Sequence, residues 1–119
     1  MKYIDGYVLP VPRKNLKAYF RIATKAAKIW REHGALEVRE CAGEQLEHPY
    51  GTSFPDLVKP KRGETVVFSW VVFRSRAHRD AVNKKVMNDP RLAEMMKMKS
   101  LPFDPKRMAY GGFITMVDQ

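Results

Sequence analysis

One stretch, ETVVFSWVVF from Glu64 to Phe73, constrains the fold of this chain more than any other. Its β-branched and aromatic residues are typical of a β-strand. Alternate residues point to opposite faces of a sheet, which divides the stretch into two sets: Val66, Phe68, Trp70 and Val72, and Thr65, Val67, Ser69, Val71 and Phe73. Because both sets are largely apolar, the pattern predicts a central strand that is covered on both faces. The few helices of a short chain can cover one face, so we expect a second copy of the chain to cover the other.

The length of 119 residues predicts a single domain that spans residues 1–119. The first residues, MKYIDGYVLP, lack the uninterrupted apolar segment of a signal peptide, and no apolar run is long enough to cross a membrane. The single cysteine, Cys41, excludes an internal disulfide and agrees with a reducing compartment. We therefore expect a cytoplasmic protein that does not bind membranes. The net charge of +9 would attract nucleic acids or acidic small molecules.

The apolar periodicity and the turn residues predict the element order β-α-β-β-α-β. Strands are expected at residues 1–12, 35–42, 64–73 and 108–117, a first helix at 15–33, a second helix after Ser75 and a short third helix at 91–98. Residues 43–63 show no periodicity and are expected to form a long, ordered loop. Short connections and right-handed crossovers make this order an α+β, ferredoxin-like βαββαβ fold. Its antiparallel sheet has the order 4-1-3-2, with both main helices on one face.

The first helix is amphipathic. Its predicted buried stripe is Leu16, Phe20, Ala23, Ala27 and Trp30, with Tyr19 beside it. Its opposite face carries Lys14, Lys17, Arg21, Lys25 and Lys28. In the second helix, the expected inner residues are His78, Ala81, Val82 and Val86. The row of cations is most simply a solvated helix face, and it also permits the alternative of a nucleic-acid-binding surface that follows a phosphate backbone.

The sheet face opposite the helices is the reason to expect a homodimer. Its large side chains are expected to come from Trp70, Phe68, Tyr7 and Leu9. Such a patch reaches roughly several hundred Å², which is near the upper end for a monomer. Packing two sheets face to face about a two-fold axis would cover it. In the alternative, the protein is a monomer whose loop at 43–63 folds over the sheet.

Several segments resemble a known family: MKYIDGYVLPVP, EHGALEVREC, TSFPDLVK, ETVVFSWVVFRSRAHRDAVNKKVMNDPR and FDPKRMAYGGF. With the motifs FSW, SRAHRD and KRMAYGGF, the chain resembles the YbaA-like family of uncharacterised bacterial proteins over nearly its whole length. The resemblance implies a dimeric α+β barrel with a ferredoxin-like protomer. That superfamily also includes cofactor-independent monooxygenases, muconolactone isomerase-like enzymes and haem-binding enzymes, so the resemblance leaves the chemistry open.

In such a barrel, the sheet face away from the helices and the long loop would enclose a cavity for a small molecule. The expected ligand-binding residues are Asp5, Tyr7, Glu37, Arg39, Cys41, Ser69, Trp70 and Tyr110, with Tyr50 and Phe54 from the loop. Asp5 is the candidate general base, because an apolar setting raises the pKa of a carboxyl group. Arg39 is the candidate residue for holding an anionic or enolate-like substrate. In the structural alternative, Asp5 pairs with an arginine or a backbone donor.

No metal or cofactor is expected. The three histidines, His33, His48 and His78, lack the spacing of a metal site. A haem ligand among them is suggested only by analogy with the superfamily. Cys41 is expected to be a small buried hydrophobic residue rather than a nucleophile.

The predicted function is therefore binding of a small, partly apolar or anionic molecule by a homodimer. A cofactor-independent oxygenase or isomerase activity is a hypothesis that rests on superfamily analogy. Two alternatives remain open: a polyanion-binding protein that uses the cationic face of the first helix, and a non-catalytic interaction module.

Overall fold

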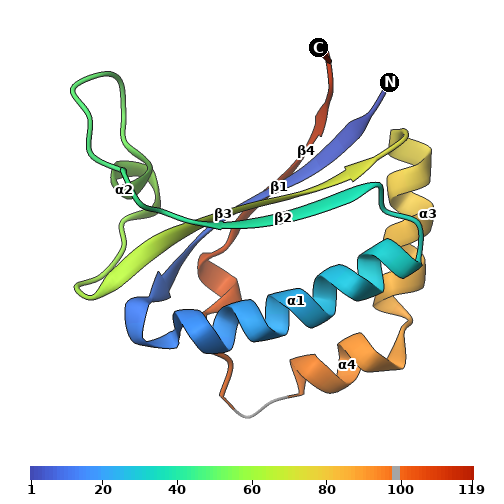
Figure 1. Cartoon of the computed structure of the whole chain (residues 1–119), viewed down its shortest axis with the longest axis horizontal. Helices are drawn as coiled ribbons and strands as arrows, with labels where there is room; N and C mark the ends of the chain where they lie inside the picture. The colour runs from blue at the N-terminus through green and yellow to red at the C-terminus, as the bar shows by residue number, and fades with distance from the viewer. Residues whose placement is uncertain (98–99) are drawn as a thin grey trace.

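The computed structural model describes residues 1–97 and 100–119. It shows one twisted sheet with the long helices on one side (Figure 1). The strands are β1 (Tyr3–Pro12), β2 (Glu37–Ala42), β3 (Glu64–Phe73) and β4 (Ala109–Ile114). The helices are α1 (Leu16–Glu32), α2 (Phe54–Val58), α3 (Arg76–Met87) and α4 (Pro90–Met96), with 3-10 turns at Arg13–Asn15 and Pro105–Arg107. These elements confirm the predicted α+β class.

The sheet has the order β2-β3-β1-β4, and every neighbouring pair of strands is antiparallel. The pairing places Asp5 opposite Val71, Tyr7 opposite Ser69 and Leu9 opposite Val67. These residues share the face that α1, α3 and α4 cover (Figure 1). The prediction that Tyr7 and Leu9 lie on the face away from the helices is therefore wrong, because the register pairs them with the helix-facing set of β3.

The core lies between the sheet and the helices. Two clusters form it, one around Phe73, Val71, Ile29 and Val86, and one around Leu9, Val11, Val67 and Tyr19. The predicted stripe of α1 contributes Tyr19 and Ala23 to the buried set, and Ile29 joins them. Because the buried side chains recur with the 3.6-residue period of a helix, the side chains on the opposite side of α1 face solvent.

Two of the three predicted helix N-caps form the expected side-chain hydrogen bond, and one does not. Ser75 and Asp89 accept hydrogen bonds from backbone amides and cap α3 and α4 as their side chains favour. Asn15 does not cap α1 in this way, because its Nδ2 donates to the carbonyl of Pro102 at 3.2 Å. Gly34 ends the α1 turn with a φ of +116°, which favours glycine.

One inner-face residue and two strand boundaries also differ from the prediction. Ala81 is exposed rather than on the inner face of α3. Strand β2 begins at Glu37 rather than at residue 35, and β4 covers 109–114 rather than 108–117. Helix α4 ends at Met96, and the predicted end at Met98 lies outside the described residues.

The long connection at 43–63 is not wholly without regular structure. It contains α2, which Ser53 caps by accepting a hydrogen bond from the amide of Asp56, and Pro55 occupies its first turn. Serine as N-cap with proline just inside the helix is a favoured start. Helix α2 brings Phe54 to the sheet face that the other helices leave uncovered, where its ring lies 6.0 Å from that of Phe68.

Within the described residues, none of the helices is both long enough and apolar enough to span a lipid bilayer.

Candidate functional site

The sheet face opposite α1, α3 and α4 is called the open face. It carries the residues Ile4, Gly6, Val8, Glu37, Arg39, Cys41, Phe68, Trp70, Val72, Ala109, Gly111 and Phe113. A shallow hollow of about 710 Å³ lies here, and Phe54 of α2 closes one side of it. Phe68 and Phe113 remain 41% and 62% exposed. The described residues that line this hollow are almost wholly apolar or aromatic, and none of them is a buried charged residue.

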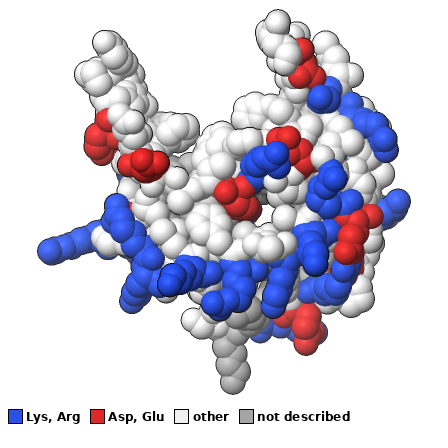
Figure 2. All heavy atoms as spheres, in the orientation of Figure 1, with Lys and Arg blue, Asp and Glu red and all other residues white. Residues whose placement is uncertain are grey.

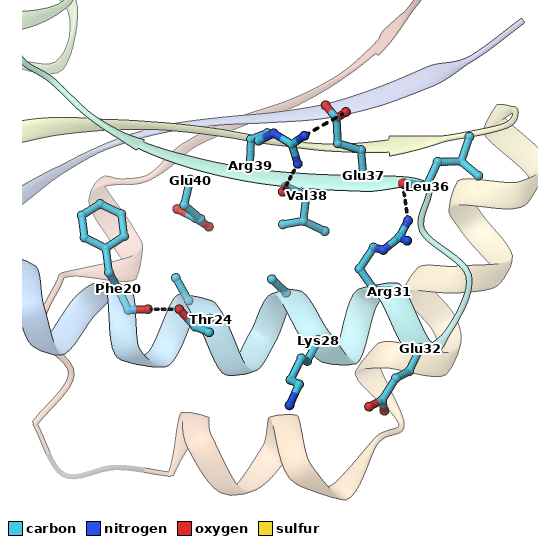
Figure 3. A pocket seen from close by; sticks show the side chains of 12 residues that line it. Phe20, Thr24, Lys28, Arg31, Glu32, Leu36, Glu37, Val38, Arg39 and Glu40 are labelled. Atoms are coloured by element: carbon cyan, nitrogen blue, oxygen red, sulfur yellow. Dashed lines mark hydrogen bonds and ion pairs between the residues drawn. The ribbon is translucent and has the colours of Figure 1, made fainter.

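A second hollow lies between helix α1 and the edge strand β2. This α1–β2 groove has a volume of about 780 Å³. Its lining is formed by Phe20, Ala23, Thr24, Ala27, Lys28, Arg31, Glu32, Leu36, Glu37, Val38, Arg39 and Glu40. Figure 3 shows Phe20 and Arg31 rising from α1 toward β2, and Val38 and Glu40 extending from β2 toward the helix. The groove therefore combines an apolar lining with a few charged groups, which is typical of small-molecule sites.

Glu40 is the carboxylate that faces into this groove. Its Oε1 accepts a hydrogen bond of 2.8 Å from the hydroxyl of Tyr19, which is itself only 6% exposed. Burial raises the pKa of Glu40, and the hydrogen bond from Tyr19 offsets part of that increase. The same burial, with the negative charge of Glu40, raises the pKa of Tyr19, which holds its hydroxyl protonated as the donor. Among the described residues, Oε2 of Glu40 has no hydrogen-bond partner.

Arg31 lies at the opposite end of the groove. Its Nη1 donates to the carbonyl oxygens of Ala35 and Leu36, where α1 turns into β2. Nε and Nη2 of Arg31 donate no hydrogen bond to any residue that the structure describes. Lys28 and Glu32 point away from β2 (Figure 3), so Arg31 is the cation of α1 that faces the strand. The groove thus has an acceptor at one end and a donor at the other.

The predicted pair of Asp5 and Arg39 is not brought together, because the two residues lie on opposite faces of the sheet. Asp5 is fully buried and accepts hydrogen bonds from Arg79 at 2.7 Å and from Asn83 at 3.1 Å. This arrangement corresponds to the structural alternative for Asp5. Arg79 also donates to the hydroxyl of Tyr110 at 3.2 Å. The cluster links β1, β4 and α3 through the core.

Three more of the predicted ligand-binding residues lie, like Asp5, in the set of strand residues that faces the helices. Tyr7 and Tyr110 stack there with ring centroids 5.0 Å apart, and Ser69 is buried opposite Tyr7 in the neighbouring strand. Burial raises the pKa of Tyr7, with the charge of Asp5 as the next cause. The register turns these side chains toward the helices, but Tyr7 and Tyr110 still border the hollow of the open face, whereas Ser69 does not.

The other predicted residues do gather on the open face. Trp70 donates from Nε1 to Glu37 at 2.8 Å, and Arg39 lies 3.6 Å from the same carboxylate. The rings of Phe68 and Trp70 are 5.4 Å apart. Cys41 is exposed on this face rather than buried as expected. Tyr50 lies on the loop and is 80% exposed, outside the hollow.

The basic face of α1 is as predicted from its spacing. Lys14, Lys17, Arg21, Lys25 and Lys28 are all exposed. Figure 2 shows a band of Lys and Arg atoms along this helix. None of these five side chains forms an ion pair with the described part of the chain.

Sequence reasoning did not single out Glu40 or its contact with Tyr19. A signal was present, because Glu40 continues the helix-facing row of Leu36 and Val38. A carboxylate in a row that faces the core requires a partner or a function. Across the described residues, no group of His, Cys, Asp and Glu side chains forms a potential metal site.

These features define a single-sheet α+β protein with an apolar open face and a mixed groove beside its edge strand. Residues 2–105 match the model of a family described as a protein of unknown function, DUF1428, and the chain belongs to this family. It is 44% identical to the uncharacterised protein YbaA of Escherichia coli K12 over the full length of both chains, and equally similar to YbaA of Shigella flexneri. These matches confirm the resemblance to the YbaA-like family.

A likeness to a solved structure supports the fold alone. An uncharacterised NIPSNAP domain protein from Burkholderia xenovorans superposes with a TM-score of 0.54 at 13% identity. The superposition covers 95% of this chain and 93% of that one.

Proposed function

We propose that this protein binds a small molecule with an apolar body and an anionic group in the α1–β2 groove. The observation that carries this proposal is the half-buried Glu40 at one end of a mostly apolar groove, with Arg31 at the other. Nε and Nη2 of Arg31 donate to no group in the described part of the chain. A protein does not gain stability from a desolvated carboxylate without an opposite charge beside it. Such a group is more simply explained by a ligand that it contacts.

The open face has a different role in this proposal, which is contact with a second copy of the chain. Its aromatic side chains form a hollow in which the described lining residues are mainly apolar, as in the centre of a protein–protein interface. Covering roughly several hundred Å² of apolar surface contributes several kcal/mol at about 25 cal/mol per Å². In this proposal the protomer is ferredoxin-like and the two sheets form a dimeric α+β barrel. A reducing, cytoplasmic location agrees with the unpaired, exposed Cys41.

An NMR titration tests the binding site. Phenylacetate, which joins an aromatic ring to a carboxylate, is added to ¹⁵N-labelled protein. The amide signals of Ala23, Ala27 and Val38 are expected to shift in a saturable way, because these residues line the groove. Shifts confined to Gly6, Gly111 and their neighbours on the open face, or no saturable shift, would contradict the proposal.

Polyanion binding is a second candidate function, favoured by the five exposed cations of the basic face. Binding of single-stranded RNA would then weaken steeply between low and physiological salt. Charge reversal of Lys17, Arg21 and Lys25 together would abolish it. Unchanged affinity in that triple variant would exclude this face as the site.

A further inference from the structure

The two ends of the α1–β2 groove carry different hydrogen-bonding chemistry, and this difference defines a class of ligand. Arg31 offers only donors, since a guanidinium has no acceptor. Glu40, when ionised, offers only acceptors, and its Oε2 is the oxygen that Tyr19 leaves without a partner among the described residues. A matching molecule must therefore present an anionic acceptor to Arg31 and a hydroxyl or similar donor to Glu40.

The spacing of the two ends limits the length of that molecule. Arg31 is fixed at the level of Leu36, just before β2, by its hydrogen bond to that carbonyl, and Glu40 lies four positions further along the extended chain. At about 3.3 Å per residue, this separation is about 13 Å. A hydrogen bond of about 3 Å at each end leaves roughly 7 Å between the two polar groups of the ligand. One aromatic ring with substituents on opposite sides fills that distance.

The walls between the two ends favour a flat apolar body. Ala23 and Ala27 present only methyl groups from α1, and Val38 faces them from β2. Phe20 stands beside the end that Glu40 occupies, where an aromatic ligand can pack against its ring (Figure 3).

We propose that the α1–β2 groove binds hydroxyaryl carboxylic acids, with the carboxylate on Arg31, the ring over Ala23 and Ala27, and the phenolic hydroxyl donating to Oε2 of Glu40. This proposal rests on the proposed function and adds the class of ligand. Tyr19 is a positioning residue here, because its hydrogen bond to Oε1 orients the carboxylate and leaves the second oxygen for the ligand. No bond is made or broken in the ligand.

The test is a cycle of two ligands and two proteins. Calorimetry compares 4-hydroxyphenylacetate with phenylacetate, which lacks only the hydroxyl, in the wild type and in Glu40→Gln. The wild type is expected to prefer the hydroxylated acid by about 10- to 100-fold, the usual effect of a hydrogen bond to a charged group. Glu40→Gln should remove most of this preference, which is measured as the ratio of the two affinities within each protein. Glu44→Gln, on the exposed loop after β2, is the matched control and should behave like the wild type.

A pH series provides a readout that a purely structural role would not change. The preference is expected to fall as the pH falls through the raised pKa of Glu40, because the protonated carboxyl is a weaker acceptor. In Tyr19→Phe, the loss of a hydrogen bond that lowers this pKa should move the midpoint to higher pH.

The outcomes separate the two proposals. If both acids bind in the groove with equal affinity, or if Glu40→Gln keeps the preference, the assignment of hydroxyaryl acids is wrong and the small-molecule site stands. If neither acid binds to the folded wild-type protein, both proposals are contradicted. Amide spectra of each variant establish that the fold is retained.

Discussion

The α1–β2 groove and the open face are hollows of similar size on opposite sides of one sheet, yet their linings differ in kind. The groove places a carboxylate and a guanidinium at the ends of an apolar floor. The open face presents aromatic rings, and its charged residues Glu37 and Arg39 are held in contacts, Glu37 with Trp70 and Arg39 with Glu37. Their similar volumes therefore do not distinguish the roles of the two hollows, whereas their linings do.

The difference in chemistry suggests a division of roles. A flat apolar surface gains free energy by excluding water over a broad area, which another protein surface can provide. A groove with a few directed polar groups gains specificity from a ligand that satisfies each of them. The following predictions test this division, beginning with the residue that belongs to neither surface.

The largest effect is expected at Asp5, which is buried on the helix side of the sheet against α3. Asp5→Ala leaves Arg79 buried without its carboxylate and should lower the free energy of unfolding by about 3–5 kcal/mol. Asp80 contacts the same guanidinium at 2.7 Å but has a side chain that is 61% exposed. Asp80→Ala is therefore the matched control, with an expected loss of about 0–1 kcal/mol.

Urea denaturation measures both changes, and Asp5→Asn replaces Asp5→Ala if the alanine variant does not fold. Equal, small losses in the two variants would show that Asp5 is not a structural residue. A function for Asp5 would then have to be considered again.

The next effect concerns the open face. Phe68→Asp places a charge at the centre of the proposed contact and should raise the dimer dissociation constant by about 100-fold or more. Sedimentation velocity measures this change. Met87→Asp alters a side chain that is also exposed, at 60%, but lies on α3. Met87→Asp should leave the dimer dissociation constant unchanged. If both variants raise this constant equally, the open face is not the contact between the two copies.

A smaller effect is expected when the groove is filled. Ala27→Leu adds side-chain volume to the groove and should weaken binding of phenylacetate by about tenfold or more, without a change in the mass of the dimer. Ala81→Leu, at an exposed alanine of α3, is the control for a general effect of the larger side chain. If Ala27→Leu binds phenylacetate as well as the wild type does, the ligand does not bind in the groove.

The smallest effect is the contribution of Glu40 to stability as a function of pH. Its pKa is raised in the folded protein, so the folded state holds this proton more tightly than the unfolded state. The resulting contribution is fully present below the ordinary carboxyl pKa of 4.5 and is lost as the pH rises through the folded value.

The difference in stability between the wild type and Glu40→Gln should therefore change across this window, to the disadvantage of the wild type at neutral pH. Thermal unfolding at several pH values measures it. A difference that is the same at every pH would show that Glu40 is not desolvated.

The sequence is sufficient for the parts of the fold that depend on local patterns. The alternation in β3 and the helical period of α1 specify these elements almost residue by residue. The caps at Ser75 and Asp89 are also local signals. The capping serine of α2 was equally visible, but a helix as short as Phe54–Val58 has too few residues to show a period.

The candidate site is harder to predict because it depends on register between strands. Alternation divides β1 into two sets, but it does not say which set shares a face with Trp70. Gly6 pairs with Trp70 and shares its face, so the side chains of Asp5 and Tyr7 lie on the opposite face, toward the helices. The contact of Tyr19 with Glu40 joins residues from two elements, and no local pattern encodes it.

The central claim is that the groove receives the small molecule and the open face receives the second copy. A crystal structure of the wild-type protein grown with 4-hydroxyphenylacetate tests both parts at once. The account predicts electron density for the acid between Arg31 and Glu40, with the Phe68 side chains of two copies packed toward each other. Density for the acid against Phe68 and Phe113, with nothing between α1 and β2, would contradict it.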